Sequence, residues 1–415
     1  MITKEIIHNI LNVKETYQTH LKIMELILDK KKREEMFDKF LQKESDLSYD
    51  WFTNYFQENQ SDRKDFMQDF TPDCVCEIVT KISENGTNNI ADICAGTGSL
   101  TIKLLNKYQE ATYHCEELSN VALAFLLFNL AIRNINAIIE HKNVLTNAIQ
   151  TRYKLTKGDK YSDIDIEKVE QENETDKFDC VVMNPPYSLK WEQLQDERFT
   201  FGIAPKTKAD YAFIQHGFFK TKETGTLIVI VPHGVLFRTQ KEYEIRKAMI
   251  ENNVVDTIIG LPDKLFLNTS IPVCIIVFKR NRKNNNILFI DASKEFKKGK
   301  KQNEMTQEHI NKIVDTYNKR AEVEKYSHVA DLNEIKENDY NLNISRYVDT
   351  FEEEPIPDLV ATMMSLIEID NKIRKTSIEL VTMMNEMKGF TKEEAESIKA
   401  WNRYIKGEQN GINET

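Results

Sequence analysis

The sequence predicts an α/β protein in which a largely parallel sheet lies between a helical region at each end. Residues 1 to about 68 contain no proline or glycine, and their apolar residues recur at three- and four-residue steps. From Asn89 onward, short apolar runs alternate with amphipathic stretches, a pattern typical of β/α units. From Pro357 the helical pattern returns.

The two ends of the chain are predicted to be helical. In the N-terminal helical domain, residues 1–68, the apolar residues at helical spacing include Ile6, Ile10, Tyr17, Leu21, Met24 and Leu28. Residues 351–415 are predicted to form a helical tail with an apolar stripe. The stripe could dock a helical partner or pack within this chain, and it consists of Met363, Leu366, Ile367, Ile373, Leu380, Met384 and Met387.

Residues 69–350 are predicted to form the central α/β domain. The predicted strands are Ile90–Cys94, Thr112–Cys115, Ala137–Glu140, Cys180–Met183, Gly225–Val231, Val255–Ile259 and Val273–Phe278. The predicted helices between them include Ser99–Lys107, Asn120–Arg133 and Ala209–Lys222. The segment from Gly158 to Lys177 has eight acidic and few apolar residues, so we expect an exposed loop there.

Composition limits the class of protein. Apolar residues make up 40% of the chain and charged residues 29%, as in an ordinary globular protein. No apolar run is long enough to span a bilayer and no signal-peptide pattern is present, so we expect a cytoplasmic protein without membrane contact. The six cysteines include no CxxC pair, so we expect no metal site.

Charge bears on whether the protein binds nucleic acid. The net charge is −10, which disfavours a protein that grips DNA phosphates without help from another chain. Two short basic clusters, Lys279–Lys283 and Lys297–Lys301, are either solvated turns or local phosphate contacts.

The segment from Asp92 to Leu100 follows a predicted strand and opens a predicted helix. Its two glycines let the backbone approach a ligand, and the helix N-terminus presents free N–H groups to a carboxylate. The next strand ends in two acids, and Glu116 is spaced to accept hydrogen bonds from the ribose hydroxyls of an adenosyl cofactor. A tight turn without a ligand is the alternative. The predicted cofactor contacts are Asp92, Cys94, Gly96, Thr97, Gly98, Ser99 and Glu116.

The tetrapeptide Asn184-Pro185-Pro186-Tyr187 follows a predicted strand, at the end where open α/β sheets bind ligands. Its prolines fix the backbone and remove two N–H donors. The Asn184 side-chain oxygen and the Pro185 carbonyl could accept both N–H groups of an exocyclic amine such as adenine N6, which favours methyl transfer by positioning. Tyr187 can stack on a base flipped from a duplex. The alternative is a proline-rich turn that caps the strand.

These motifs, in this order, resemble the methylation subunits of type I restriction–modification systems, which are N6-adenine DNA methyltransferases. The resemblance covers about residues 66 to 350. Further matches to the family lie on both sides of the tetrapeptide, at Phe70-Thr71-Pro72, Lys177–Asp179, Ala209–Phe213, Val231–Arg238, Leu261-Pro262, Phe266, Thr269–Pro272 and Tyr340–Tyr347.

The resemblance implies that residues 69–350 form a Rossmann-like methyltransferase sheet with S-adenosylmethionine as cofactor. It adds expected cofactor contacts at Phe70, Thr71, Pro72, Asn143, Val144 and Asn184. Asn143 stands where the family usually has an Asp that binds the cofactor's adenine amine; an amide oxygen can accept that hydrogen bond without the charge. The cofactor loop also departs from the family, with Ile93 in place of a proline and Ala95 in place of a glycine.

The resemblance also implies partners: double-stranded DNA, a separate specificity subunit and two copies of this chain per complex. It leaves open whether an endonuclease subunit is present. One alternative is a protein glutamine N5-methyltransferase, because a glutamine amide presents the same planar NH2, although such enzymes are shorter. An N4-cytosine methyltransferase would more often carry Ser in place of Asn184. A third alternative, a non-catalytic scaffold in a DNA-binding assembly, would have no need of the cofactor.

Overall fold

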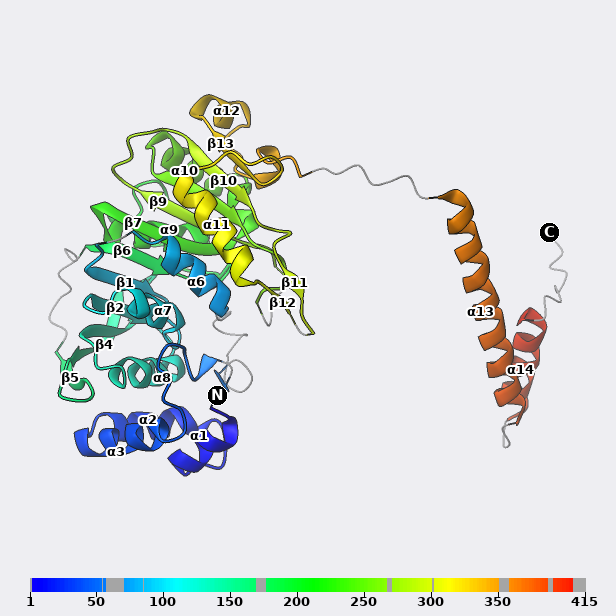
Figure 1. Ribbon diagram of the computed structural model, residues 1–415, viewed down its shortest axis with the longest axis horizontal. Coiled ribbons are helices and arrows are strands. Elements are labelled where there is room, and N and C mark those ends of the chain that lie inside the picture. The colour runs from blue at the N-terminus through cyan, green and yellow to red at the C-terminus, as the bar shows by residue number, and fades with distance from the viewer. Residues whose placement is uncertain are drawn as a thin grey trace. The chain divides into compact units, whose positions relative to one another are not determined.

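The computed structural model describes residues 2–53, 55–56, 71–84, 86–168, 177–266, 271–300, 302–350, 358–386 and 391–405. The chain divides into two compact units, Met1–Thr350 and Phe351–Thr415. The first unit contains the sheet and the second contains two helices (Figure 1).

The described part of the first unit contains an eleven-stranded sheet in the order β13-β10-β8-β9-β7-β6-β1-β2-β3-β4-β5. The strands are β1 (Asn89–Ile93), β2 (Thr112–Glu117), β3 (Ala137–Asn143), β4 (Ala148–Thr156), β5 (Asp163–Glu167), β6 (Phe178–Met183), β7 (Thr221–Pro232), β8 (Val255–Gly260), β9 (Val273–Lys279), β10 (Ile287–Asp291) and β13 (Ser327–Ala330). A separate small hairpin joins β11 (Lys297–Lys298) to β12 (Asn303–Glu304).

The predicted α/β fold is confirmed, and all seven predicted strands lie side by side in its centre, in the order β3-β2-β1-β6-β7-β9-β8. Five of them, β3 to β7 in this order, are parallel, whereas β9 runs antiparallel to both of its neighbours. The prediction of a loop between Gly158 and Lys177 is wrong for Asp163–Glu167, which form the edge strand β5. Residues 169–176 of that segment lie outside the described residues.

The order of the strands determines where a ligand can bind. From β1 the chain continues to β2 on one side, and later to β6 on the other side of β1. At such a switch point the connections leave in opposite directions, which opens a crevice at the carboxyl ends of the strands. The loop after β1 contains the two glycines, and the tetrapeptide follows β6.

Helices α1 (Lys4–Leu11), α2 (Gln18–Ile27) and α3 (Lys30–Leu41) cover the outer side of α8 (Asn120–Ala131), as Figure 1 shows. Helix α8 is apolar on all sides and almost completely buried, as expected for a helix covered on both faces. The ring of Phe128 makes edge contacts with Phe37, Phe40 and Phe52 at centroid distances of 4.8–4.9 Å. The N-terminal helices therefore share a core with the sheet.

The helical prediction for residues 1–68 holds in part. Residues 42–52 form turns and extended chain, and 57–70 lie outside the described residues. In α2 the buried apolar residues are Ile23 and Ile27, whereas Leu21 is exposed. Tyr17, which precedes α2, is exposed as well.

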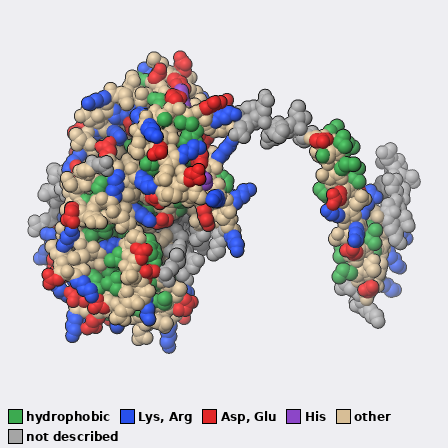
Figure 2. Space-filling view, in the orientation of Figure 1, with side chains coloured by type: hydrophobic (Ala, Val, Ile, Leu, Met, Phe, Trp, Pro, Cys, Tyr) green, Lys and Arg blue, Asp and Glu red, His purple; other side chains and the backbone are tan. Residues whose placement is uncertain are grey.

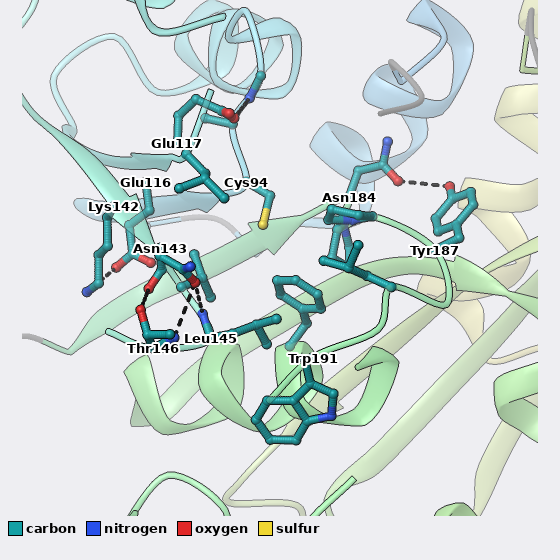
Figure 3. A pocket seen from close by; sticks show the side chains of 18 of the residues that line it. Cys94, Glu116, Glu117, Lys142, Asn143, Leu145, Thr146, Asn184, Tyr187 and Trp191 are labelled. Carbon is teal, nitrogen blue, oxygen red and sulfur yellow. Dashed lines mark hydrogen bonds and ion pairs between the residues drawn. The ribbon is translucent and has the colours of Figure 1, made fainter. Parts of the chain in front are cut away.

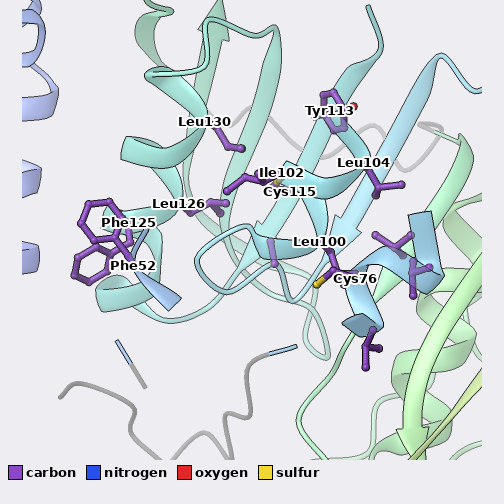
Figure 4. Close-up of a cluster of buried hydrophobic side chains, with 14 of the residues drawn as sticks. Phe52, Cys76, Leu100, Ile102, Leu104, Tyr113, Cys115, Phe125, Leu126 and Leu130 are labelled. Atoms are coloured by element: carbon purple, nitrogen blue, oxygen red, sulfur yellow. The ribbon is translucent and has the colours of Figure 1, made fainter. Parts of the chain in front are cut away.

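The remaining helices of the first unit flank the sheet. Figure 4 shows the core on one face, where Leu126 and Leu130 of α8 and Ile102 of α7 lie over Cys115 of β2. These helices are α6 (Asp73–Ile82), α7 (Ser99–Lys107), α9 (Asp210–Lys220), α10 (Lys241–Glu251), α11 (Gln307–Lys319) and α12 (Leu332–Glu337), with short 3₁₀ turns at His233–Leu236 and Ile344–Arg346.

The second unit is a pair of helices, α13 (Leu359–Glu386) and α14 (Lys392–Ile405). Only Val381 and Ile398 are buried among its described residues. The rest of the apolar stripe on α13 is largely exposed, and apolar side chains are visible along that helix in Figure 2. In the described part of the chain, no helix is long and apolar enough to cross a bilayer.

Candidate active site

A cavity of about 370 Å³ lies at the carboxyl ends of β1, β2, β3 and β6. Its lining includes eleven of the residues predicted from the sequence: Thr71, Cys94, Gly96, Ser99, Glu116, Asn143, Val144, Asn184, Pro185, Pro186 and Tyr187. In Figure 3, Glu116 and Asn143 lie on one side of it and Asn184 and Tyr187 on the other. The fold thus brings the two motifs, about 90 residues apart in the sequence, to one cavity.

Four predicted contacts, Pro72, Asp92, Thr97 and Gly98, do not line the cavity, and Phe70 lies outside the described residues. Gly98 has a left-handed φ of 94°, and a Cβ there would lie 2.9 Å from Leu126 Cδ1. Its missing side chain therefore leaves room for α8. Gly96, by contrast, lines the cavity with a φ of 58°.

The hydroxyl groups of the glycine loop face the N-terminal region. Asp50 Oδ2 accepts hydrogen bonds from Thr97 Oγ1 at 2.5 Å and from Ser99 Oγ at 2.8 Å. Asp50 Oδ1 accepts one from Asn129 Nδ2 of α8 at 2.8 Å. One carboxylate thus ties the loop and the first turn of α7 to the N-terminal segment.

Asp92 is buried beneath the loop. Its Oδ2 accepts hydrogen bonds from the backbone N–H of Thr101 at 3.1 Å and from Thr101 Oγ1 at 2.6 Å. Its Oδ1 is buried and has no hydrogen-bond partner among the described residues. Burial raises the pKa of Asp92 to about 7, with a smaller contribution from the charge of Glu117.

The two acids at the end of β2 have different environments. Glu117 Oε2 accepts a hydrogen bond from the Gly96 N–H at 2.8 Å, and Oε1 accepts one from the Ser119 N–H at 2.7 Å. Burial raises the pKa of Glu117, although these N–H groups oppose the shift. Glu116, in contrast, is held by side chains: Lys142 Nζ lies 3.2 Å from Oε1, and His216 Nε2 lies 3.1 Å from Oε2.

Three possible metal ligands, His114, Glu116 and Glu140, meet beneath the cavity. The protein's own cations already lie among their oxygens, with Lys142 next to Glu116 and Arg152 Nη2 2.6 Å from Glu140 Oε1. Burial alone would raise the pKa of Glu116, but its contact with His216, which donates a hydrogen bond, and the charge of Lys142 hold that pKa well below its usual range. Basic side chains therefore provide the charge compensation that a metal would give.

Asn143 ends β3 and lines the cavity, but its side-chain oxygen is engaged. Asn143 Oδ1 accepts hydrogen bonds from the backbone N–H groups of Leu145 at 3.1 Å and Thr146 at 3.2 Å. Both lone pairs of that oxygen thus stabilise the turn after β3. The predicted hydrogen bond from a cofactor amine to Asn143 stays a prediction, and it would have to replace one of these bonds.

In the tetrapeptide, Asn184 Nδ2 donates to Thr71 Oγ1 at 3.0 Å, and the Tyr187 hydroxyl donates to Asn184 Oδ1 at 2.8 Å. These bonds fix the plane of the amide. Tyr187 is only 6% exposed, and Phe266 meets its ring edge to face at 6.2 Å. Both prolines contribute to the cavity wall.

Several cavity residues were missed at the sequence level: Glu117, Leu118, Lys142, Leu189, Lys190, Trp191, Glu192 and Phe213. Glu117 is the neighbour of the predicted Glu116, and both side chains line the cavity. Phe213 lies in the matched segment Ala209–Phe213, whose position in the family motif was the available signal. The segment that contains Trp191 carries no comparable motif.

The basic clusters differ in structure. The side chains of the first bind carboxylates of this chain: Lys279 lies 2.9 Å from Glu84, and Arg282 lies 3.1 Å from Asp256. In the second, Lys297 and Lys298 form the exposed strand β11, and Lys301 lies outside the described residues. Lys279 and Arg282 therefore have structural partners, while phosphate contact by the exposed Lys283 and by the second cluster stays a prediction.

The order of the central strands, with β9 antiparallel beside β7, defines the class of protein: the fold is a Rossmann-like methyltransferase fold. The family follows from sequence comparison, because residues 45–355 match the family described as N-6 DNA Methylase. The chain belongs to this family, and the predicted resemblance to type I methylation subunits is confirmed.

Among relatives, the chain is 30% identical over 340 residues to the type I restriction enzyme MpnII methylase subunit of Mycoplasma pneumoniae, covering 77% of this chain and 60% of that protein. It is 29% identical over 355 residues to the MjaVII methylase subunit of Methanocaldococcus jannaschii, covering 80% and 58%. The chain therefore spans about three fifths of the length of these relatives.

Solved structures agree. A type I restriction–modification methyltransferase subunit from Streptococcus thermophilus is 38% identical, with a TM-score of 0.61 over 69% of this chain and 60% of that one. A modification subunit of a type I restriction enzyme from Vibrio vulnificus has a TM-score of 0.55 at 17% identity over 77% of this chain and 66% of that one, which supports the fold alone.

Proposed function

We propose that this chain transfers a methyl group from S-adenosylmethionine to adenine N6 in DNA, as the modification subunit of a type I restriction–modification complex. The observation that carries the proposal is the shared cavity of about 370 Å³. On one side of it lies Asn184-Pro185-Pro186-Tyr187, and on the other lie the glycine loop and the acids of β2. Family membership supports the reaction class.

The residues present fit the cofactor. Glu117, anchored by Gly96 and Ser119, offers its remaining lone pairs to ribose hydroxyls. Leu118 and Phe213 line the cavity and provide apolar surface for a purine ring. Asp92 lies beneath the glycine loop and does not line the cavity, so we expect it to act on the cofactor by holding the loop through Thr101. When bound, S-adenosylmethionine supplies an electrophilic methyl group on a positively charged sulfur.

The tetrapeptide acts on the target amine. Asn184 Oδ1 and the Pro185 carbonyl accept its two N–H groups, which directs the nitrogen lone pair toward the methyl group. The hydrogen bond from Asn184 to Thr71 holds the amide in place before the base arrives. The Tyr187 hydroxyl, which now donates to the same oxygen, then shares it with the amine or turns away. The ring of Tyr187 stacks on the flipped base.

The test measures transfer of labelled methyl groups to DNA in the presence of the specificity subunit. Asn184→Ala should abolish transfer while cofactor binding survives, because the amide acts on the target and not on the cofactor. Tyr187→Phe should retain most activity and Tyr187→Ala should lose it, because stacking needs only the ring. Transfer at the wild-type rate by Asn184→Ala would refute the mechanism. Methylation of a glutamine peptide, with none of DNA, would favour the alternative enzyme.

The second unit supports the proposed partner. On α13, Leu359, Leu366, Ile373 and Leu380 recur every seven residues and are 48–72% exposed. A seven-residue apolar repeat is the pattern by which helices pair in coiled coils. We assign this face to a helical region of the specificity subunit. Two copies of this chain per complex and a cytoplasmic location are part of the same proposal.

A further inference from the structure

The segment between the tetrapeptide and α9, residues 188–209, contains a buried arginine that contacts the turn after β3. Arg198 is 3% exposed. Its Nη1 donates to the Val144 carbonyl at 2.7 Å, and its Nη2 donates to the Leu145 carbonyl at 3.0 Å. Val144 and Leu145 both line the cavity. One guanidinium thus connects the segment that follows the tetrapeptide to the turn after β3, on the opposite side of the cavity.

The remaining donors of Arg198 are also used. Nε donates to Asp196 Oδ1 at 3.0 Å, Nη2 donates to Asp196 Oδ2 at 2.5 Å, and Nη1 donates to His216 Nδ1 at 2.9 Å. A guanidinium has five N–H groups, and all five have acceptors here. A lysine, with one nitrogen and three donors, cannot reach all of these acceptors together.

The contact with Arg198 determines the state of His216. Because a guanidinium can only donate, Nδ1 of His216 must accept, so the ring is neutral and carries its proton on Nε2. That N–H donates to Glu116 Oε2 at 3.1 Å. Burial lowers the pKa of His216 to about 4, although Glu116 opposes the shift, which agrees with a neutral ring. Glu116 Oε1 in turn accepts from Lys142.

The chain of contacts Arg198–His216–Glu116–Lys142 therefore runs beneath the cavity from residues 188–209 through α9 to β2 and β3. Three of its members are 0–1% exposed. Glu116 and Lys142 also line the cavity. A change in the position of Arg198 would thus move both the turn after β3 and the side chain of Glu116 at the end of β2.

We propose that Arg198 is a positioning residue for the cofactor: it holds the Val144 and Leu145 carbonyls and, through His216, the carboxylate of Glu116, so that the cavity keeps its shape before the cofactor binds. This inference rests on the proposed function, because it takes the cavity to be the cofactor site. Its consequence is that cofactor affinity depends on a residue that follows the catalytic tetrapeptide.

The first experiment measures S-adenosylmethionine affinity of the full chain by calorimetry. Arg198→Lys should weaken binding about tenfold. In the complex with the specificity subunit, kcat at saturating cofactor and the KM for DNA should be little changed. The matched control is Arg246→Lys. Arg246 is 2% exposed and also donates to backbone carbonyls, those of Tyr340 and Arg238, away from the cavity. This control should lose thermal stability but keep its cofactor affinity.

The second experiment uses rescue at His216. Glutamine can accept from Arg198 and donate to Glu116 as the imidazole does, so His216→Gln should bind within about twofold of wild type. His216→Leu should lose about tenfold, and combining it with Arg198→Lys should add little, because both act through one chain of contacts.

The outcomes separate the two proposals. If the wild-type chain does not bind S-adenosylmethionine, the proposed function fails. If the wild type binds and Arg198→Lys binds equally well while losing stability as Arg246→Lys does, Arg198 is structural only and the inference is overturned. Equal affinities for His216→Gln and His216→Leu would overturn the link through the imidazole.

Discussion

The two acids at the end of β2 are neighbours in the sequence but have different partners. Successive residues of a strand point to opposite sides. Glu117 accepts backbone N–H groups from the glycine loop, whereas Glu116 meets Lys142 and His216. An acid next to the loop backbone is better placed for ribose hydroxyls than one whose oxygens are already engaged by the charge of Lys142 and a hydrogen bond from His216. We therefore expect Glu117 to be the ribose ligand, whereas the sequence motif predicts that role for Glu116.

A cofactor analogue decides between the two acids. Wild type should prefer S-adenosylhomocysteine to its 2′-deoxy analogue, because the 2′-hydroxyl donates to a carboxylate. Glu117→Ala should bind the natural compound about tenfold more weakly and lose this preference, since charge-assisted hydrogen bonds contribute roughly 1.5–3 kcal/mol. Glu116→Gln should keep the preference. Loss of the preference in Glu116→Gln alone, measured by calorimetry, would return the ribose role to Glu116.

Asp92 makes stability depend on pH. Its pKa is about 7 in the folded chain because of burial, against 3.8 for an ordinary aspartate. The folded state therefore favours the protonated carboxyl, and the stability this contributes is present below pH 4 and is lost as pH rises toward 7. Between pH 5 and pH 8 the cofactor-free chain should lose about 2–3 kcal/mol through this group.

Urea unfolding of wild type and Asp92→Asn at both pH values isolates the effect, because all other titrating groups are shared. The variant should show the smaller loss of stability on going from pH 5 to pH 8. If both proteins lose the same amount, the carboxyl is ionised throughout that range and its proposed burial cost is wrong.

At the scale of elements, apolar runs in the sequence predicted seven strands of the sheet. All seven predicted strands exist, and the apolar runs at β6 and β9 show why: five of six and six of seven of their residues are buried. Strands β4 and β5, at one end of the sheet, were missed because exposed and half-buried side chains such as Ile166 leave no apolar run there. Strand β10 was missed as well, although four of its five residues are buried, because its apolar run is only four residues long. Strand β13, at the opposite edge, has only four residues, of which two are half-buried. Periodicity identified α2 but not which of its faces is buried.

The site was predictable where a motif reports backbone geometry, as in the glycine loop and the tetrapeptide. It was not predictable where a side chain's role depends on contacts distant in sequence. Thr97 was expected to contact the cofactor, yet it is completely buried and donates to Asp50, 47 residues earlier. No local pattern reveals that pairing. Arg198 and His216 belong to the same category.

The contact between the N-terminal segment and α7 can be tested through Asp50. Asp50→Ala leaves the completely buried hydroxyl of Thr97 without its carboxylate acceptor, and the buried amide of Asn129 loses one of its two acceptors. An unsatisfied buried donor costs about 1–3 kcal/mol, so the free energy of unfolding should fall by at least that amount. The control is Asp159→Ala, an exposed aspartate before β5, which should change it by less than about 0.5 kcal/mol. Equal effects in thermal denaturation would contradict the importance of Asp50.

At the scale of the whole molecule, charge and surface together favour a protein that works in a complex. The net charge is −10, and the basic side chains Lys279 and Arg282 are paired with acids of this chain. The positive surface that these clusters leave for phosphates consists of the exposed Lys283 and the exposed lysines near β11. A partner that supplies DNA contacts would resolve this shortage. The periodicity of the tail predicted helices. It could not predict that the apolar stripe is exposed, because a helix buried in a core carries the same stripe.

The apolar face of α13 provides the test of this partnership. Replacing Leu366, Ile373 and Leu380 by serine should weaken assembly with the specificity subunit and reduce methylation of DNA. These side chains are 48–61% exposed, and serine removes the apolar surface with which they would pack against the partner helix. Cofactor binding should be unchanged, since the cavity belongs to the first unit. Deleting residues from 357 onward should have the same effect.

The control replaces Lys375 and Glu379 of the same helix by serine, which alters exposed polar positions and should leave assembly intact. Assembly is measured by analytical ultracentrifugation of the two chains mixed at known concentrations. The isolated chain should bind cofactor without methylating a defined DNA sequence efficiently, because the proposed base-reading surface belongs to the partner. Sequence-specific methylation by the purified single chain at several turnovers per minute would show that the proposed division of labour is wrong, as would undiminished assembly of the triple variant.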